Sequence, residues 1–466
     1  TVHSPLVGAY YSDWFPSNAA QGTLRQHLVP SQGPDPSRVD SADPAVAQEA
    51  IAQATRSGVD FFALDWWPTR PAQNVNVNAF LRAKNIGDIK FCMLYETWDL
   101  GFDAGNESTP VTPQLEARFD ADLVTFAHRY FANPSYLRIR GRPVVVLYLT
   151  RTLTGDVQGM MTGARAVLEA QGYDPFFIGD EVFWRVTAEN TAAGAPGFTE
   201  APQVSRIDLF DAVTAYSLYA GGPPDPLTPA PDFTTFPGLT SLVADQLALY
   251  RRYQQASHGW VPVVPDVTPG FNSRGVRLSV NEHAEPRQWV PGASPGSTLA
   301  HYLSQIARPL LSPTLPMVFV TSWNEWNEDT AVAPVGGTPT ASDDSPSGTA
   351  YTQGYTYGGE GWSDLDAIRD FSDMAWGRVT FAGRARAHVT VTAAVGSRIV
   401  ETVHTDAEGF YVLPRTATCP PTLVLSAGGR RVTLRCRATV ATRADLTDAD
   451  AVEPGTRADP WQARRT

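Results

Sequence analysis

Eight short apolar or aromatic runs, separated by helical patterns, constrain the fold of this chain most strongly. The runs lie at residues 7–11, 59–67, 91–96, 143–148, 176–181, 212–216, 261–266 and 318–325. Near-continuous apolar runs are typical of strands buried on both faces of a parallel sheet. The clearest amphipathic segments lie at 45–56, 113–131, 160–170, 239–255 and 297–306. This alternation predicts a series of β/α units.

The number of units predicts a closed α/β architecture, a (β/α)8 TIM barrel at residues 1–375. A Gly-rich phosphate fingerprint does not follow the first run, so a dinucleotide-binding sheet is disfavoured. The chain has 466 residues, which leaves room for a second domain beside a barrel of about 250 residues or more.

The segment 376–447 differs in texture from the rest of the chain. Its short alternating runs, joined by Gly, Asp, Ser and Thr turns, predict a small all-β sandwich that serves as an accessory domain. The stretch 405–411, TDAEGFY, resembles transthyretin-like modules of the carboxypeptidase-regulatory type. The charged residues 448–466 are expected to form a tail.

Composition excludes several classes of partner. Hydrophobic residues make up 43% of the chain and charged residues 18%, which is typical of a globular protein. The net charge of -12 argues against a nucleic-acid partner, which would require a basic face. No apolar run is long enough for a membrane span, and the first residues lack a leader pattern, so we expect an already processed, soluble chain. The sequence leaves the oligomeric state open.

The three cysteines predict a disulfide rather than a metal site. They lack C-x-x-C spacing, so we expect no metal and no cofactor. Cys419 and Cys436 flank the turn at 427–430, which predicts that they pair across a hairpin. Such a bond fits a secreted or extracellular protein. Cys92 lies in an apolar run and is expected in the core.

The segment W-N-E-W-N-E places two carboxylates, Glu325 and Glu328, where the eighth run opens into a loop. Hydrolysis of a glycosidic bond requires an acid and a second carboxylate. The rings of Trp323 and Trp326 would exclude water and offer a face to a sugar, and burial would raise one pKa. The alternative interpretation is a solvated pair that caps a helix.

Other candidate site residues stand at strand ends, where barrel proteins carry their working groups. They are Tyr10, Tyr11, Asp65, Trp66, Trp67, Tyr95, Glu96, Tyr148, Asp180, Glu181, Tyr216, Asp266 and Asn324. Glu96, Asp180 and Glu181 either contact substrate or form ion pairs within the barrel mouth.

Several motifs resemble glycoside hydrolase family 99, the endo-α-mannosidases, and the related WbsX domain. They are VGAYY at 7–11, GVDFFALDWW at 58–67, RPVVV at 142–146, PGF at 269–271 and the W-N-E-W-N-E segment. The resemblance implies retaining cleavage of an α-mannoside or other α-glycan without a metal. It implies that Glu328 is the acid/base, that Glu325 draws the proton from the sugar 2-hydroxyl, and that Arg274 and Arg277 line the site. Asp65 and Asn327 depart from the family pattern.

Three functions follow from these features. The first is a glycoside hydrolase acting on an oligosaccharide or polysaccharide. The second is a glycosyltransferase, a frequent description of WbsX-like domains, although the sequence shows no convincing phosphate cradle or metal-binding D-x-D motif. The third is a non-catalytic carbohydrate-binding protein, which would not require two costly buried carboxylates.

Overall fold

The structure is a computed structural model of the chain. It describes residues 5–16, 28–29, 39–103, 108–182, 204–218, 239–272, 285–290, 292–335, 341–342, 360–375, 381–405, 409–413, 422–434, 442–443 and 446.

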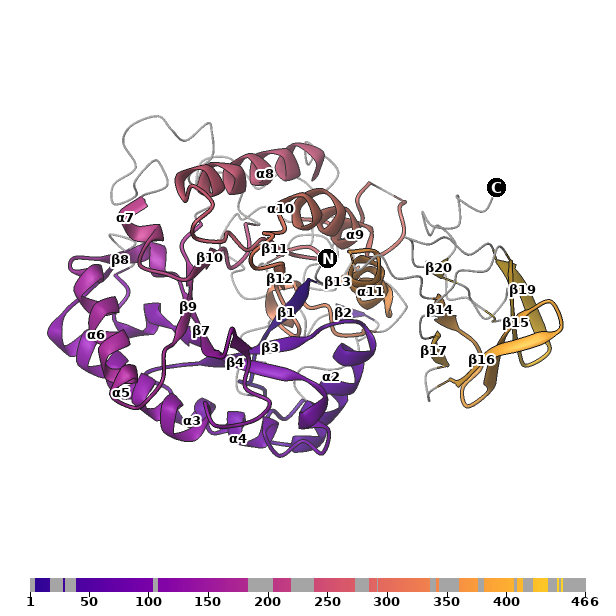
Figure 1. The fold of residues 1–466 in the computed structure, drawn as a ribbon, viewed down its shortest axis with the longest axis horizontal. Helices are drawn as coiled ribbons and strands as arrows, with labels where there is room; N and C mark the ends of the chain where they lie inside the picture. Colours follow the sequence, from indigo (N-terminus) through magenta and orange to yellow (C-terminus); the bar gives the residue numbers. More distant parts are fainter. Residues whose placement is uncertain are drawn as a thin grey trace.

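Eight parallel strands form the wall of a (β/α)8 TIM barrel, as predicted (Figure 1). They are β1 (Leu6–Tyr11), β3 (Phe61–Trp66), β4 (Lys90–Glu96), β7 (Arg142–Tyr148), β9 (Phe176–Asp180), β10 (Ala212–Thr214), β11 (Asp266–Val267) and β12 (Met317–Val320). Neighbours in sequence pair in parallel, and β12 pairs with β1. A bridge from Val213 in β10 to Val263, just before β11, joins the last two neighbours of the ring.

The seventh strand is shorter than the sequence predicts. The apolar run at 261–266 yields only the two-residue β11 and the isolated bridge at Val263. Pro262 and Pro265 explain the difference, because proline has no N–H to donate to a neighbouring strand.

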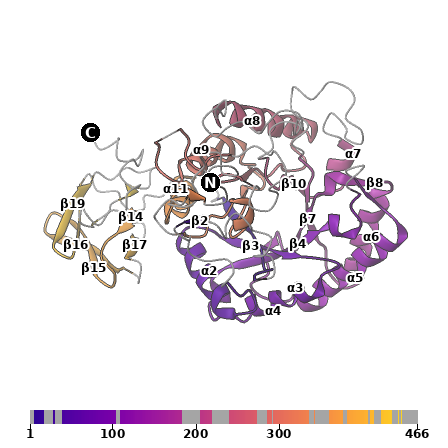
Figure 2. The same ribbon diagram turned by 180° about the vertical axis from the view of Figure 1, so that it is seen from behind.

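The five predicted helices are present and surround the strands (Figures 1 and 2). They are α2 (Pro44–Arg56), α5 (Pro113–Arg129), α6 (Val157–Glu169), α8 (Leu239–Ala256) and α9 (Ser297–Tyr302), which continues as η8 (Leu303–Ala307). The shorter helical elements are α3 (Pro71–Asn74), η3 (Ile86–Asp88), α4 (Asn76–Phe80), η4 (Thr97–Leu100), η5 (Thr150–Thr152), α7 (Val204–Ile207), α10 (Arg308–Leu310) and η9 (Trp326–Glu328). A further helix, α11 (Ser363–Ala375), contacts α9.

Side-chain caps fix where two of the longer helices begin. The carboxylate of Asp43 accepts from the N–H of Ala45 at the start of α2, and the hydroxyl of Thr112 accepts from Leu115 at the start of α5. Each cap satisfies an N–H that lacks a partner within its helix.

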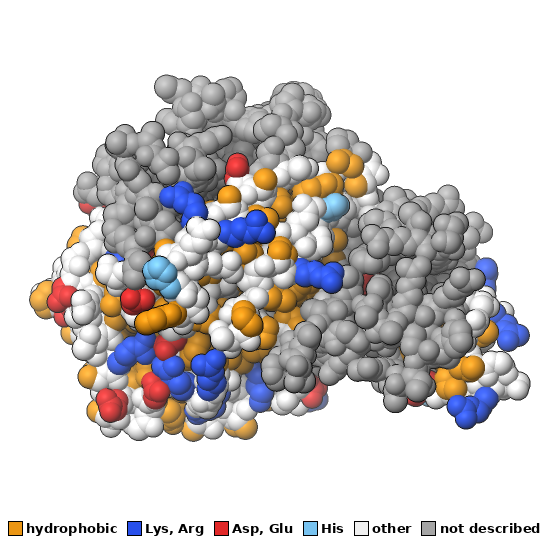
Figure 3. Space-filling model, turned by 45° about the horizontal axis from the view of Figure 1, so that its top comes forward, with side chains coloured by type: hydrophobic (Ala, Val, Ile, Leu, Met, Phe, Trp, Pro, Cys, Tyr) orange, Lys and Arg blue, Asp and Glu red, His pale blue; other side chains and the backbone are white. Residues whose placement is uncertain are grey.

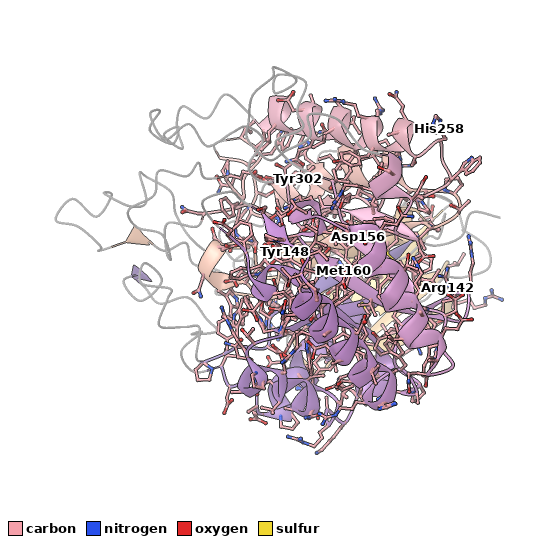
Figure 4. The ribbon with its side chains drawn as sticks, turned by 90° about the vertical axis from the view of Figure 1, so that its left-hand side faces the viewer. Arg142, Tyr148, Asp156, Met160, His258 and Tyr302 are labelled. Atoms are coloured by element: carbon pink, nitrogen blue, oxygen red, sulfur yellow. The ribbon has the colours of Figure 1, made fainter. Side chains whose placement is uncertain are left out.

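The two ends of the barrel are distinguished by β7. Arg142 begins this strand and Tyr148 ends it, and Figure 4 shows them at opposite ends of the barrel. His258, which lies between α8 and β11, is at the Arg142 end. The carboxyl ends of the strands, where barrel enzymes carry their sites, therefore lie at the Tyr148 end.

The C-terminal part consists of two small sheets. The first contains β14 (Phe381–Arg384), β17 (Phe410–Leu413) and β20 (Thr442–Arg443), and the second contains β15 (Thr390–Val395), β16 (Arg398–His404), β18 (Leu423–Ala427) and β19 (Arg430–Leu434). Their buried side chains form a hydrophobic cluster separate from that of the barrel. These sheets fit the predicted small β domain, whereas its domain boundaries and its likeness to transthyretin-like modules stay predictions.

Five short strands complete the assignment. They are β2 (Leu28–Val29), which pairs with β13 (Ala341–Ser342), β5 (Thr109–Pro110), which pairs with β8 (Leu153–Thr154), and β6 (Arg138–Ile139), which pairs with β7.

None of the helices that the structure describes is both long and apolar enough to cross a membrane. Basic and acidic side chains are interspersed over the described part of the face in Figure 3.

Candidate active site

A tight loop carries both candidate carboxylates at the end of β12. Ser322 donates its N–H to the carbonyl of Thr330 at 2.8 Å, and the two hydroxyl groups lie 2.9 Å apart. These contacts close the loop around the W-N-E-W-N-E segment. Thr321 stands where the loop begins. Its hydroxyl donates to the carboxylate of Asp266, with Oγ1 lying 3.0 and 2.8 Å from the two carboxylate oxygens.

Glu325 is buried and fixed by its own loop. Its N–H donates to Ser322 Oγ at 2.8 Å, and its Oε1 accepts from the N–H of Asn327 at 2.9 Å. The side chain thereby caps the short helix η9, and only 5% of Glu325 is exposed. The alternative interpretation from the sequence is a solvated residue that caps a helix. Glu325 does cap a helix, but it is buried rather than solvated.

Glu328 has a different environment from Glu325. It is half-buried, and its carbonyl accepts from the N–H of Asn272 at 2.8 Å. Two carboxylates on one loop, one buried and one partly exposed, have the unequal surroundings that acid/base chemistry requires.

Asn324 joins the eighth strand end to the first. Its Oδ1 accepts from the N–H of Ser12 at 2.7 Å, and its Nδ2 donates to the carbonyl of Ser12 at 2.8 Å. Asn324 is buried, and these two hydrogen bonds join it to the backbone of the segment that follows β1.

Arg287, which sequence reasoning missed, supports the far side of the loop. Its Nη2 donates to the carbonyls of Asp329 and Ala331 at 2.9 and 2.8 Å. Its Nη1 donates to Asp364 at 2.9 Å, which ties the loop to α11. No local motif marks Arg287, because its partners lie 42 to 77 residues away along the chain.

Aromatic rings line the interior of the barrel beside this loop. Tyr10 stacks on Phe319 with ring centroids 4.9 Å apart and lies 4.7 Å from Tyr216, which contacts Tyr148 at 4.9 Å. Burial raises the pKa of Tyr10 well above its ordinary value, and the charge of Asp266 adds to the effect. The phenol is therefore neutral and remains a donor.

Asp180 and Glu181 form ion pairs within the protein. Asp180 accepts from Arg151 at 2.5 Å and from the N–H of Tyr216 at 2.9 Å. Glu181 accepts from Arg206 at 2.6 Å. Of the two sequence-based interpretations, the structure shows the internal ion pairs.

A second group of acids follows β1, β3 and β4. Asp65 Oδ2 accepts from Trp67 Nε1 at 2.9 Å, and Glu96 lies close enough to alter its pKa. Burial raises the pKa of Asp65 to about 7, and burial together with the charge of Asp65 raises that of Glu96 well above its usual range. Asp13, which sequence reasoning missed, is also buried beside Asp65. Its only sequence signal is its place just after the first strand.

Four candidate residues have side chains on the helix side of the sheet. Tyr11 contacts Phe80 of α4, Trp66 contacts Phe126 of α5, and Tyr95 donates to Asp122 of α5 at 2.9 Å. Trp323 packs on Phe62, which also contacts Phe80. Successive side chains of a strand point to opposite faces, so Tyr10, Asp65 and Glu96 face the interior while their neighbours do not. Trp326 contacts Phe15 at the rim.

Several predictions cannot be placed. Arg274, Arg277, Cys419 and Cys436 lie outside the described residues. Cys92 is buried and free, as expected of a core residue. Within the described segments, no group of three or more His, Cys, Asp or Glu side chains has an arrangement that would hold a metal ion.

The fold and the loop define a (β/α)8-barrel protein with a carboxylate pair at the carboxyl end of its eighth strand. A sequence model of the family described as glycosyltransferase WbsX matches residues 6–338. The chain belongs to this family.

Two curated relatives are also similar to the chain. Both are named uncharacterized protein WxcX and come from two strains of Xanthomonas campestris pv. campestris; each is 25% identical over 343 residues. The match covers 70% of this chain and 44% of each relative, so the chain spans less than half of their length.

Solved structures share the barrel. The GH99 endo-alpha-mannosidase from Bacteroides thetaiotaomicron, in complex with BIS-TRIS-propane, is 16% identical with a TM-score of 0.52, covering 80% of this chain and 97% of that one. A glycoside hydrolase-like protein is 16% identical with a TM-score of 0.55, covering 80% and 95%. At 16% identity, this similarity shows that the fold is shared and nothing more.

Proposed function

We propose that the chain is a glycoside hydrolase that acts on an oligosaccharide or polysaccharide. The observation that carries the proposal is the unequal pair on the loop after β12, with Glu325 buried and Glu328 half-buried. Glycosidic cleavage needs one group that donates a proton to the leaving oxygen and a second that assists at the sugar.

The surroundings of the two carboxylates support their roles. Glu328 is the acid/base, because its partial exposure lets it reach a leaving oxygen and exchange protons with water. Glu325 assists from a fixed position, since Ser322 and the N–H of Asn327 hold it. Its role toward the 2-hydroxyl rests on the family resemblance.

The solved structures that share the barrel support the hydrolase over the transferase. The barrel is shared with proteins named as glycoside hydrolases, one of them an endo-alpha-mannosidase. Asp65 and Asn327 differ from the mannosidase pattern, so the proposal extends to a glycan and not to mannose in particular.

Hydrolysis of a glycan panel tests the proposal. The panel contains α-mannans, α-glucans and galactose- or arabinose-containing polysaccharides, and the proteins are the native chain, Glu328→Gln and Glu325→Gln. Glu169→Gln, on the exposed face of α6, is the matched control. We expect sugar release by the native and control proteins and a loss of at least about 100-fold in both site variants. Cleavage that survives in both site variants would refute the assignment.

Glycosyl transfer is the second candidate, favoured by the description of the family. It predicts release of a nucleotide from a nucleotide-sugar donor only when an acceptor glycan is present. Nucleotide release without any hydrolysis of the panel would replace the hydrolase proposal with this one.

A further inference from the structure

Helix α11 is built into the barrel, although it lies beyond residue 338, where the family match ends. It contacts α9, and Figures 1 and 2 show the two helices side by side. Ser372 of α11 donates its hydroxyl to the carbonyl of Gly58 at 3.3 Å. The guanidinium of Arg56 lies 3.9 Å from the centre of the ring of Trp362, just before the helix. These contacts fix α11 against the barrel.

Arg287 connects α11 to the loop that follows β12. Its Nη1 donates to Asp364, in the first turn of α11, at 2.9 Å. Its Nη2 donates to the main-chain carbonyls of Asp329 and Ala331 at 2.9 and 2.8 Å. A guanidinium is planar, so the carboxylate that binds Nη1 also sets the direction in which Nη2 points. Arg287 and Asp364 are only 7% and 3% exposed, so these bonds are shielded from water.

The backbone of Glu328 is held from outside its own loop. Its carbonyl accepts from the N–H of Asn272, and the turn directly after it, at Asp329, is bound by Arg287. These two supports lie close together, because an added Cβ at Gly270 would lie only 2.8 Å from Cγ of Arg287. A change in the orientation of Arg287 would therefore release one support of Glu328.

We propose that Asp364 is a positioning residue for Glu328. It acts through Arg287, whose guanidinium it orients toward the turn after Glu328, and so it fixes where the acid/base carboxylate meets the leaving oxygen. Glu325 depends less on α11, because its carboxylate accepts from the N–H of Asn327 within the loop. The inference deepens the proposed function and rests on it for the role of Glu328.

Steady-state kinetics of the full chain test this role, with the panel glycan that the native protein hydrolyses as the substrate. Asp364→Ala removes the acceptor of Nη1 and is expected to lower kcat about tenfold with KM changed less than about twofold, because a misplaced acid impairs the chemical step rather than binding. Asp364→Asn keeps an acceptor oxygen and should retain at least about half of the native kcat. Arg287→Lys keeps the charge without the planar fork and should lose kcat as Asp364→Ala does.

Asp366→Ala is the matched control on the same helix. Asp366 is buried and pairs with Arg369 at 3.3 Å, so its replacement removes an ion pair of α11 other than the one with Arg287. Its kcat should stay within about twofold of the native value. Urea unfolding confirms that each variant is folded, and Arg287→Lys provides the test if Asp364→Ala does not fold.

A double-mutant cycle with Glu328→Gln separates positioning from a general loss of structure. If Asp364 acts through Glu328, Asp364→Ala should lower the residual activity of Glu328→Gln by less than about twofold, whereas a general defect would multiply the two losses. Hydrogen exchange adds a readout that needs no substrate. Peptides that cover residues 326–333 should exchange faster in Asp364→Ala and Arg287→Lys than in Asp366→Ala.

The outcomes separate this inference from the proposed function. Native kcat in both Asp364→Ala and Arg287→Lys, or full multiplication of the losses in the cycle, would refute the positioning role and keep the hydrolase. Unchanged exchange at 326–333 in both variants would refute the role as well. Faster exchange there, with no hydrolysis of any glycan, would support the hold of α11 on Glu328 and refute the hydrolase.

Discussion

Arg287 contacts Asp329 through two kinds of bond, its Nε to the carboxylate at 3.3 Å and its Nη2 to the main-chain carbonyl at 2.9 Å. Asp329 has a left-handed backbone conformation, with φ of 53°, directly after Glu328. Left-handed conformations are unfavourable for most residues other than glycine, so the contact with Arg287 stabilises the turn that ends the W-N-E-W-N-E segment.

Replacing Arg287 by Met is expected to destabilise the fold. The change leaves the buried carboxylates of Asp329 and Asp364 without their cation, which costs about 3–5 kcal/mol. Urea unfolding measures the loss. Arg140→Met is the control, because Arg140 is exposed and its one hydrogen bond within the described residues goes to the carbonyl of Thr314, and it should change stability by less than about 0.5 kcal/mol. Equal stability of the two variants would show that Arg287 does not support the loop.

Glu360 makes stability depend on pH. It is buried 3.6 Å from Arg287, and burial raises its pKa from 4.5 to about 7. Between these values the folded state binds the proton more tightly than the unfolded state, so stability falls as pH rises from 4.5 to about 7. The difference corresponds to about 3 kcal/mol.

Glu360→Gln removes this dependence because an amide does not ionise. We expect the variant to gain stability over the native protein progressively between about pH 5 and pH 8, in urea unfolding at several pH values. Glu169→Gln, at an exposed position of α6, should run parallel to the native protein. A constant difference between Glu360→Gln and native protein at every pH would contradict the raised pKa.

The strands could be predicted from the sequence because burial on both faces makes each run apolar throughout. The same property hides which side chains face inward, since a run without alternation carries no information on its faces. The sequence therefore groups Trp66 and Tyr95 with Asp65 and Glu96 among the site residues, although the contacts of Trp66 and Tyr95 are with α5. Arg287 and Asp13 escaped prediction because their surroundings are assembled from distant segments.

Gly8 fills a position that a larger residue cannot occupy. An added Cβ would lie 2.1 Å from Cζ of Phe61, whose ring is held in the barrel interior against Phe319. Gly8→Ala is expected to destabilise the protein by about 1–3 kcal/mol through overpacking. Gly87→Ala is the matched control, since no atom lies within 4 Å of its added Cβ. The midpoints of urea unfolding compare the two, and equal midpoints would show that the interior relaxes around the methyl group.

Two tyrosines on opposite faces of the sheet separate activity from stability. Tyr10 faces the interior beside Phe319, and its buried hydroxyl has no partner among the described residues. Tyr10→Phe is expected to lower kcat/KM about tenfold, the effect of one lost hydrogen bond to substrate, without destabilising the fold. Tyr95→Phe instead removes the donor to Asp122 and should cost about 1 kcal/mol of stability while leaving kcat/KM unchanged. The same kinetic loss in both variants would mean that the face of the sheet does not decide which tyrosine meets the glycan.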